Sequence, residues 1–183
     1  MRAVIQRAIF ANVTVFDSEE VAWEAMNNGT YDEICNPPDP LSDELYTGRE
    51  VGRISVGLVV FLGVEVGDTK EDATYMADKI CGLRIFEDQD SKMNLSLLDC
   101  AADEAYMLAI SQFTLLGDVR KGKRPSFTAA EKPERANELY RDFVNKVTAN
   151  GVHVEEGEFQ SDMLVRIHNQ GPVTVLIDSR KTF

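Results

Sequence analysis

One short run constrains the fold of this chain most. Residues 107–110 are Met-Leu-Ala-Ile, an apolar run of strand length, and the polar pair Ser111-Gln112 interrupts it before Phe113. A continuous apolar run of this length is typical of a buried strand. We therefore expect a buried strand over residues 106–115, with two hydrogen-bonding side chains placed where packing alone favours Val or Leu.

A second run near the C-terminus is equally restrictive. Residues 169–175 read Asn-Gln-Gly-Pro-Val-Thr-Val, so a Gly-Pro pair stands directly before a β-branched strand pattern. Proline fixes its own φ and has no N–H to donate, which indicates a turn of restricted geometry feeding the last strand. Neither run has the pattern of a metal site or of a phosphate-binding loop.

Together the two runs resemble the signatures of the D-aminoacyl-tRNA deacylases, a Ser-Gln-x-Thr strand end and an Asn-x-Gly-Pro-x-Thr turn. The resemblance covers nearly the whole chain except about residues 17–50. Several separated motifs in one order are far more specific than a single short pattern. The other segments that resemble this family, in its order, are residues 1–7, 62–68, 83–88, 93–96 and 123–127.

Strand patterns dominate the rest of the chain, and two helices are predicted over residues 69–81 and 131–150. The length of 183 residues suits a single domain, 1–183. We expect an α+β domain with a curved, mainly antiparallel, barrel-like sheet and two packed helices. The resemblance implies the same fold and a homodimer. The remaining predicted strands are residues 2–15, with a possible break near Ala8, and residues 51–64, 83–86, 152–155, 163–168 and 173–177.

Residues 17–50 depart from the family, which has a tight hairpin here. They carry ten acidic side chains and one basic side chain, Arg49. Loop signals at residues 27–29 and 36–40 favour an acidic loop insertion at about 17–50, with a short helix over residues 18–25. The insertion is either decorative or a partner-binding arm. The net charge of −12 is unfavourable for RNA binding, but most of it belongs to this segment.

The inventory of reactive side chains is thin. The three cysteines and two histidines lie in no metal-type spacing or nucleophile motif, so we expect no disulfide framework, no metal and no cofactor. A Ser-His-Asp triad assembled from distant residues stays open. The N-terminus lacks the pattern of a signal peptide and no run reaches transmembrane length, which predicts a cytoplasmic protein without a membrane partner.

An ester hydrolase without an obvious base needs help from its substrate, and an aminoacyl-tRNA offers the 2′-hydroxyl of its terminal adenosine. The catalytic residues expected under the resemblance are Ser111, Gln112, Phe113 and Thr114. Backbone N–H groups of residues 112–114 would stabilise the oxyanion. Ser111 and Thr114 are alternatively nucleophiles, or hydroxyls that satisfy buried backbone groups.

The resemblance assigns substrate selection to Gly171, Pro172 and Arg7. It implies a cis bond before Pro172, and a Gly-Pro turn of one subunit that enters the pocket of the other. Its carbonyls would crowd an L side chain and leave room for a D one, and glycine would also pass. Arg7 would hold the turn; from its strand position alone, Arg7 is a solvated charge.

The remaining expected contacts are with the 3′ CCA end of D-aminoacyl-tRNA. Two alternatives stay open: a catalytically silent tRNA-binding or dimeric scaffold module, and a relative that edits another mischarged tRNA with a trans Gly-Pro turn. The basic run at residues 120–124 favours phosphate contacts. The substrate-binding residues expected are Asn169, Thr174, Met163, Phe127, Arg120, Lys121, Lys123 and Arg124.

Overall fold

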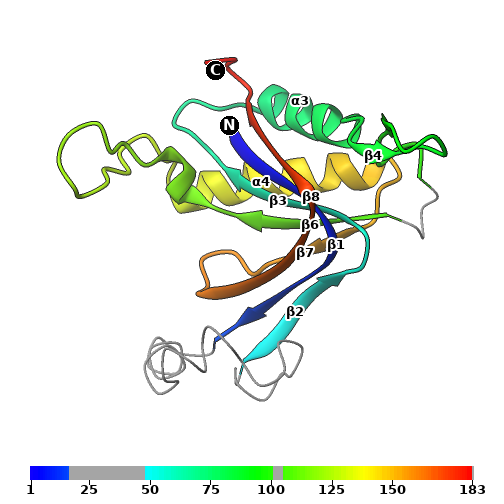
Figure 1. Ribbon diagram of the computed structural model, residues 1–183. Helices are drawn as coiled ribbons and strands as arrows, with labels where there is room; N and C mark the ends of the chain where they lie inside the picture. Colours follow the sequence, from blue (N-terminus) through cyan, green and yellow to red (C-terminus); the bar gives the residue numbers. More distant parts are fainter. Residues whose placement is uncertain (17–47, 101–104, 183) are drawn as a thin grey trace.

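The computed structural model describes residues 1–16, 48–100 and 105–182 (Figure 1). The predicted helices are confirmed; the first is one residue shorter than expected and the second is three residues shorter. Thr69 precedes the first helix, and its amide donates to the Asp72 carboxylate over 2.9 Å. The elements are β1 (Arg2–Val15), β2 (Arg49–Ile54), β3 (Gly57–Gly63), α3 (Lys70–Cys81), β4 (Phe86–Glu87), β5 (Met93–Leu95), β6 (Tyr106–Ser111), the 3-10 helix η2 (Phe113–Leu116), α4 (Pro133–Ala149), β7 (Val154–Glu156) and β8 (Met163–Asp178).

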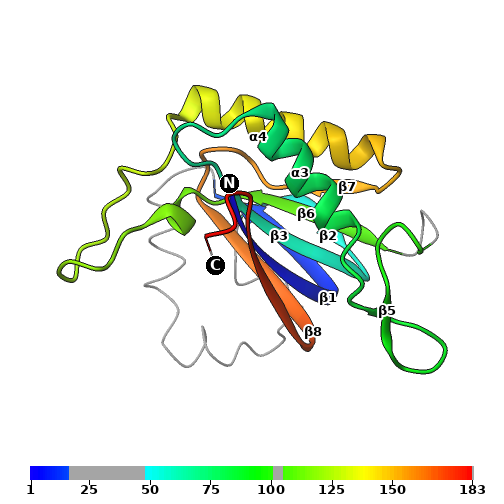
Figure 2. The ribbon, with the colours of Figure 1, turned by 90° about the horizontal axis from the view of Figure 1, so that it is seen from above.

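Strand β1 organises the sheet. Along one edge it pairs first with β3 and then with β2, and along its other edge it pairs with β8, in each case antiparallel. Strand β6 continues the sheet by running parallel to both β3 and β7. The resulting order β2-β1-β3-β6-β7, with β8 also on β1, gives the curved sheet of Figures 1 and 2. The expected α+β class with a curved, largely antiparallel sheet is confirmed.

Both faces of the sheet bury apolar side chains. Helices α3 and α4 cover one face (Figure 2), and α4 presents Leu139, Phe143 and Val147 to it at the spacing of one helical stripe. The other face has a smaller core around Val13, Val59 and Leu108. A fully buried side chain of this size contributes about 1.5–3 kcal/mol. Strand β6 is therefore buried on both faces, which explains its uninterrupted apolar run.

The predicted strand over residues 106–115 is wrong beyond Ser111. Its neighbour β3 ends at Gly63, and the last bond of the ladder runs from the Gln112 amide to the Leu62 carbonyl over 2.8 Å. The chain then closes a 3-10 turn, because the Leu115 amide donates to the Gln112 carbonyl over 3.4 Å. A Cβ on Gly63 would lie 2.4 Å from the Leu116 side chain, so glycine permits η2 to pack here.

Other boundaries also differ from the sequence prediction. Residues 51–64 divide into β2 and β3, and the strand expected over residues 83–86 begins only at Phe86, where β4 pairs with β5. The two strands expected between residues 163 and 177 are one strand, β8, because both parts pair with β1. These strand limits depend on pairing with a neighbouring strand, and a local sequence pattern carries no information on that pairing.

The predicted insertion lies mostly outside the described residues, as does the helix expected over residues 18–25. Arg49 and Glu50, which we had included in the insertion, belong to β2 and pair with Val15 and Thr14 of β1. The segment is therefore flanked by an antiparallel strand pair. Among the described residues, no helix combines the length and apolar character needed to cross a membrane.

Candidate active site

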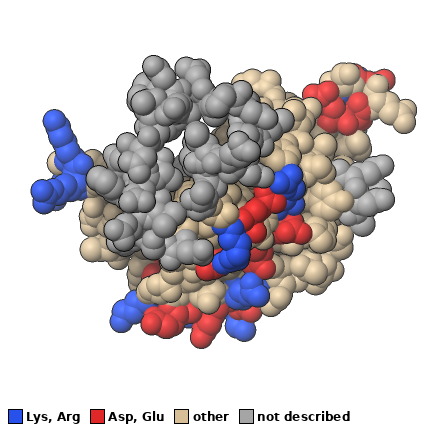
Figure 3. All heavy atoms as spheres, turned by 90° about the horizontal axis from the view of Figure 1, so that it is seen from below, with Lys and Arg blue, Asp and Glu red and all other residues tan. Residues whose placement is uncertain are grey.

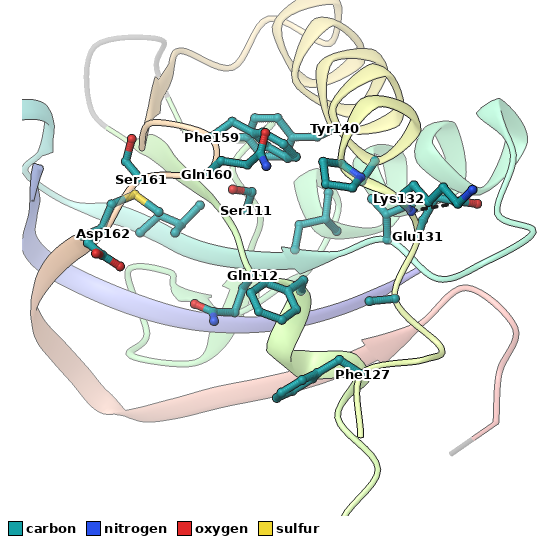
Figure 4. Close-up of a pocket in the computed structure, with 18 of the residues that line it drawn as sticks. Ser111, Gln112, Phe127, Glu131, Lys132, Tyr140, Phe159, Gln160, Ser161 and Asp162 are labelled. Atoms are coloured by element: carbon teal, nitrogen blue, oxygen red, sulfur yellow. Dashed lines mark hydrogen bonds between the residues drawn. The ribbon is translucent and has the colours of Figure 1, made fainter. Parts of the chain in front are cut away.

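A pocket of about 780 Å³ opens at the carboxyl end of β6 (Figure 4). Its volume falls within the usual range of small-molecule sites, and its walls are mainly apolar and aromatic. Four parts of the chain form it: the ends of β3 and β6 with η2, the segment before α4, the first turns of α4, and the loop between β7 and β8. The lining residues used below are Ser111, Gln112, Phe113, Phe127, Glu131, Lys132, Ala136, Tyr140, Phe159, Asp162 and Met163.

Ser111 and Gln112 sit where β6 leaves the sheet. Ser111 is in register with Leu62 of β3, and its hydroxyl has no hydrogen bond to any described residue. The Gln112 side-chain amide donates to the Thr114 hydroxyl oxygen. Thr114 does not line the pocket, so its connection to the site runs through Gln112.

The backbone amides of this turn differ in their availability. The Gln112 amide is already used by the Leu62 carbonyl, so it is not free to stabilise an oxyanion. Phe113 and Thr114 begin η2, and the first amides of a helical turn have no partner within it. These two N–H groups, rather than the three predicted, remain as candidate donors.

Tyr140 ties two walls of the pocket to β6. Its hydroxyl donates to the Ala109 carbonyl over 3.0 Å, and the Gly157 amide donates to the same oxygen over 2.9 Å. Burial raises the pKa of Tyr140, so the phenol keeps its proton and remains a donor. Its ring lies near that of Phe159, with 6.2 Å between the centroids. Helix α4 and the start of the β7–β8 loop thus meet at Ala109.

The two sides of the pocket mouth have different character. On one side the rings of Phe113 and Phe127 meet edge to face, with 5.1 Å between their centroids. On the other side lie the polar residues Gln160, Ser161 and Asp162 (Figure 4). The mouth therefore offers apolar ring surface on one side and a carboxylate on the other.

The pocket has no histidine to act as a base. His153 approaches Glu155 at 2.9 Å, and His168 lies against the Phe10 ring, with 5.3 Å between the ring centroids. Neither histidine lines the pocket, so a Ser-His-Asp triad at Ser111 is not formed. In the part of the chain that the structure describes, no group of three His, Cys, Asp or Glu side chains is placed to hold a metal ion.

The Gly-Pro pair forms an exposed bulge in β8. Ala8 pairs with Asn169 and Gln6 pairs with Thr174, so residues 170–173 stand opposite Arg7 alone. The Asn169 side-chain amide closes the neck of the bulge: its Nδ2 donates to the backbone carbonyls of Arg7 and Val173, each over 3.1 Å.

The peptide bond between Gly171 and Pro172 is cis, and Gly171 has a φ of 142°. An L side chain rarely adopts this φ, so glycine suits the position. Both residues are exposed.

Arg7 is buried, with 4% of its surface exposed, and is not the solvated charge that its strand position indicates. Its guanidinium donates to the Ile85 carbonyl over 2.6 Å and to the Gln170 carbonyl over 3.4 Å. Glu87 lies 3.5 Å away and completes the contacts. Arg7 therefore connects the Gly-Pro bulge to the segment that leads into the β4–β5 hairpin.

The predicted residues thus fall into three separate places. Ser111, Gln112, Phe113, Phe127 and Met163 share the pocket, whereas the bulge and the basic run at 120–124 lie outside it. The pocket residues that α4 and its preceding segment supply could not be recognised in the sequence, because at helical spacing they have the pattern of ordinary core or surface positions. The residues of the bulge are Arg7, Asn169, Gly171, Pro172 and Thr174; those missed in the pocket include Glu131, Lys132, Ala136 and Tyr140.

Comparison with known proteins bears on this geometry. A solved structure described as c-Myc DNA Unwinding Element Binding Protein has a TM-score of 0.74 and 30% identity, covering 97% of this chain and 98% of that one. A second, described as a probable eukaryotic D-amino acid tRNA deacylase, has a TM-score of 0.63, covers 96% and 97%, and at 18% identity shows likeness of fold alone.

Relatives found by sequence have higher identities to this chain than these two solved structures. Proteins named D-aminoacyl-tRNA deacylase are 56% identical in Koribacter versatilis, over 74% of this chain and 89% of the relative, and 45% identical in Desulforamulus reducens, over the whole of both chains. A family model described as D-Tyr-tRNA(Tyr) deacylase matches residues 42–178. With most of the chain matched in this way, the protein belongs to the D-Tyr-tRNA(Tyr) deacylase family.

Proposed function

We propose that this chain hydrolyses D-aminoacyl-tRNA to a free D-amino acid and tRNA. The observation that carries the proposal is the pocket at the end of β6, where about 780 Å³ of largely apolar space adjoins Phe113, the first residue of η2. This space suits a terminal adenosine together with its aminoacyl group. The ring of Phe159 suits a face of the base, and backbone N–H groups suit the charge that develops on an ester carbonyl.

The chemistry is attack of water on the ester carbonyl carbon. The bond from that carbon to the ribose oxygen breaks, and the ribose oxygen takes up the proton that water loses. Since no histidine lines the pocket, we assign proton transfer to the neighbouring ribose hydroxyl of the substrate. The chain supplies the position of the ester and the amides of Phe113 and Thr114, where one such donor is worth about 2.7–4 kcal/mol.

The two hydroxyls of the signature run are less suited to act as nucleophiles. A serine or threonine needs an adjacent base to be activated. Ser111 has no hydrogen-bonded base, and Thr114 accepts a hydrogen bond from Gln112 and stands outside the pocket lining.

Selection between D and L substrates falls to the Gly-Pro bulge in this proposal. The bulge is exposed and does not line the pocket of its own chain, which fits a bulge that enters the pocket of a second copy. The bulge, whose Gln170 and Val173 carbonyls are held by Arg7 and Asn169, would then exclude an L side chain with its backbone carbonyls, while D residues and glycine pass. This requires a homodimer.

The same proposal extends to the domain organisation of the chain and to its cellular compartment. We propose that residues 1–183 form one domain with an acidic insertion at about 17–48. A chain that acts on charged tRNA belongs where translation takes place, so we place it in the cytoplasm.

The test is hydrolysis of matched D-tyrosyl-tRNA and L-tyrosyl-tRNA by the purified protein, with the Pro172→Ala variant beside it. We expect cleavage of the D ester alone, and loss of that selectivity in the variant. If neither ester is cleaved while tRNA still binds, the deacylase proposal fails and a tRNA-binding scaffold takes its place.

A further inference from the structure

The segment that follows η2 forms a projecting loop. Asp118 and Ser126 make an antiparallel bridge, with N···O distances of 2.8 and 3.0 Å, so residues 119–125 form a closed loop above it. In Figure 1 this loop extends from the body on the side opposite to β4. We refer to residues 118–126 as the basic loop.

Not all of its cations are available. The Arg120 guanidinium donates to both carboxylate oxygens of Asp118, over 2.9 and 2.7 Å, and these bonds hold the pKa of Asp118 well below its usual range. Arg120 is therefore already engaged by Asp118, within the loop itself. Lys121, Lys123 and Arg124 are exposed and have no ion pair with any described residue. In Figure 3, Lys and Arg side chains protrude on the same side as the loop in Figure 1.

The base of the loop carries exposed aromatic surface. Phe113 is 58% exposed and Phe127 is 38% exposed, although both rings also line the pocket. Exposed ring faces next to cations that no described residue pairs are the combination that binds single-stranded nucleic acid, because every base has a face that can stack and every linkage carries a phosphate.

The opposite side of the mouth is unsuited to a polyanion. It presents the Asp162 carboxylate, and Glu158 nearby is already paired with Arg49 at 2.6 Å. A nucleic-acid strand leaving the pocket on that side would meet negative charge, whereas on the loop side it meets rings and cations. Charge therefore decides the direction in which such a strand leaves.

We propose that the basic loop binds the single-stranded nucleotides that precede the terminal adenosine of the tRNA. Their bases stack on Phe113 and Phe127, and their phosphates contact Lys121, Lys123 and Arg124. Arg124 lies three residues from Phe127, a separation of at most about 11 Å, so the linkages next to the pocket are within reach. This inference rests on the proposed function and adds the path of the substrate to it.

The first experiment compares two variants with the same change in charge. One carries Lys121→Gln, Lys123→Gln and Arg124→Gln. The control carries Lys70→Gln, Lys79→Gln and Lys92→Gln, three exposed lysines of α3 and the β4–β5 turn. With D-tyrosyl-tRNA, the loop variant should show a KM raised about tenfold or more and an unchanged kcat. The slope of the logarithm of its tRNA-binding constant against the logarithm of the salt concentration should be smaller in magnitude by about 2. The control should behave as wild type.

A minimal substrate, D-tyrosyl-adenosine, separates the loop from the chemistry, because it lacks the phosphates. The loop variant should hydrolyse it at the wild-type rate. Equal losses on both substrates, or an unchanged KM for tRNA, would overturn the proposal while leaving the deacylase function intact.

Binding of a short RNA that ends in CCA tests the loop without any hydrolysis. Phe127→Leu should weaken this binding about fivefold or more, as loss of one stacked base does. An RNA with abasic sites before the adenosine should bind wild type and Phe127→Leu alike. If the loop variants bind this RNA more weakly than wild type but no ester is cleaved, the proposed function fails and the proposed RNA path stands. If the variants bind the RNA as tightly as wild type, the proposed path fails.

Discussion

The pocket and the Gly-Pro bulge begin from two equally short runs of sequence but are built in opposite ways. The pocket is concave and needs four separated parts of the chain to close around Ser111 and Gln112. The bulge is convex and needs only β1, β8 and the buried cation of Arg7. Within one chain, no residue of the bulge lines the pocket. Under the proposed function, chemistry and selection therefore depend on different residues of one chain, and we expect that each can be altered while the other is retained.

The largest effect should come from filling the pocket. Ala136 of α4 lines it, so Ala136→Phe places a ring in the space for the aminoacyl group. We expect kcat/KM for D-tyrosyl-tRNA to fall at least a hundredfold, about 2.7 kcal/mol. Steady-state hydrolysis measures this. Asn137→Phe is the matched control, since Asn137 has similar exposure and does not line the pocket. Equal losses in both variants would show that the pocket is not the site.

Removal of the cation under the bulge should affect selection instead. In Arg7→Met the Gln170 and Ile85 carbonyls lose a charged donor, so the free energy of unfolding should fall by about 1.5–3 kcal/mol. The ratio of D to L hydrolysis should drop about tenfold or more while D-tyrosyl-tRNA is still cleaved. Arg84→Met, which removes an exposed guanidinium bound to Asn94, serves as control. Unchanged selectivity in a folded Arg7→Met protein would separate the bulge from selection.

A smaller effect is expected where the pocket walls meet. Tyr140→Phe keeps the ring and removes the hydroxyl that donates to the Ala109 carbonyl, which retains the Gly157 amide. We expect a loss of about 0.5–1.5 kcal/mol in unfolding free energy. The value of kcat should fall a few-fold with little change in KM, and the D to L ratio should stay constant. A changed D to L ratio would contradict the separation of pocket and bulge.

The smallest effect concerns the contribution of the Asp178 carboxylate to the free energy of unfolding at acidic pH. Burial alone would raise the pKa of Asp178, but hydrogen bonds from Thr182, the Arg180 amide and Arg2 lower it below its ordinary value. Arg2 also donates to the Leu115 carbonyl of η2 over 3.4 Å, so this carboxylate supports the turn that carries the site.

A lowered pKa in the folded state means that the stabilisation is complete above the unfolded pKa of about 3.9 and is lost as the pH falls through the folded value. The difference in unfolding free energy between wild type and Asp178→Asn should therefore be constant from pH 7 to about pH 5 and shrink below about pH 4. Urea denaturation at several pH values measures this. An equal difference at pH 3 and pH 7 would contradict it.

Much of the fold could be predicted because its causes are local. The Thr69–Asp72 cap, the apolar stripe of α4 and the alternation along β1 lie within a few residues of each other. The limits of β6 and β8 could not, since they depend on where a neighbouring strand ends or continues. The same holds for Arg7, whose burial comes from Ile85 and Gln170, far away in the sequence.

The sequence by itself determined the family, the α+β class and the two short runs at Ser111 and Gly171, because each is a pattern within one segment. Only the tertiary structure decided which residues surround those runs. Tyr140, Ala136 and the Phe113–Phe127 pair reach the pocket through helix packing and loop bridging. The physical reason is that burial and hydrogen-bond partners are properties of the packed chain, whereas periodicity and capping are properties of a few consecutive residues.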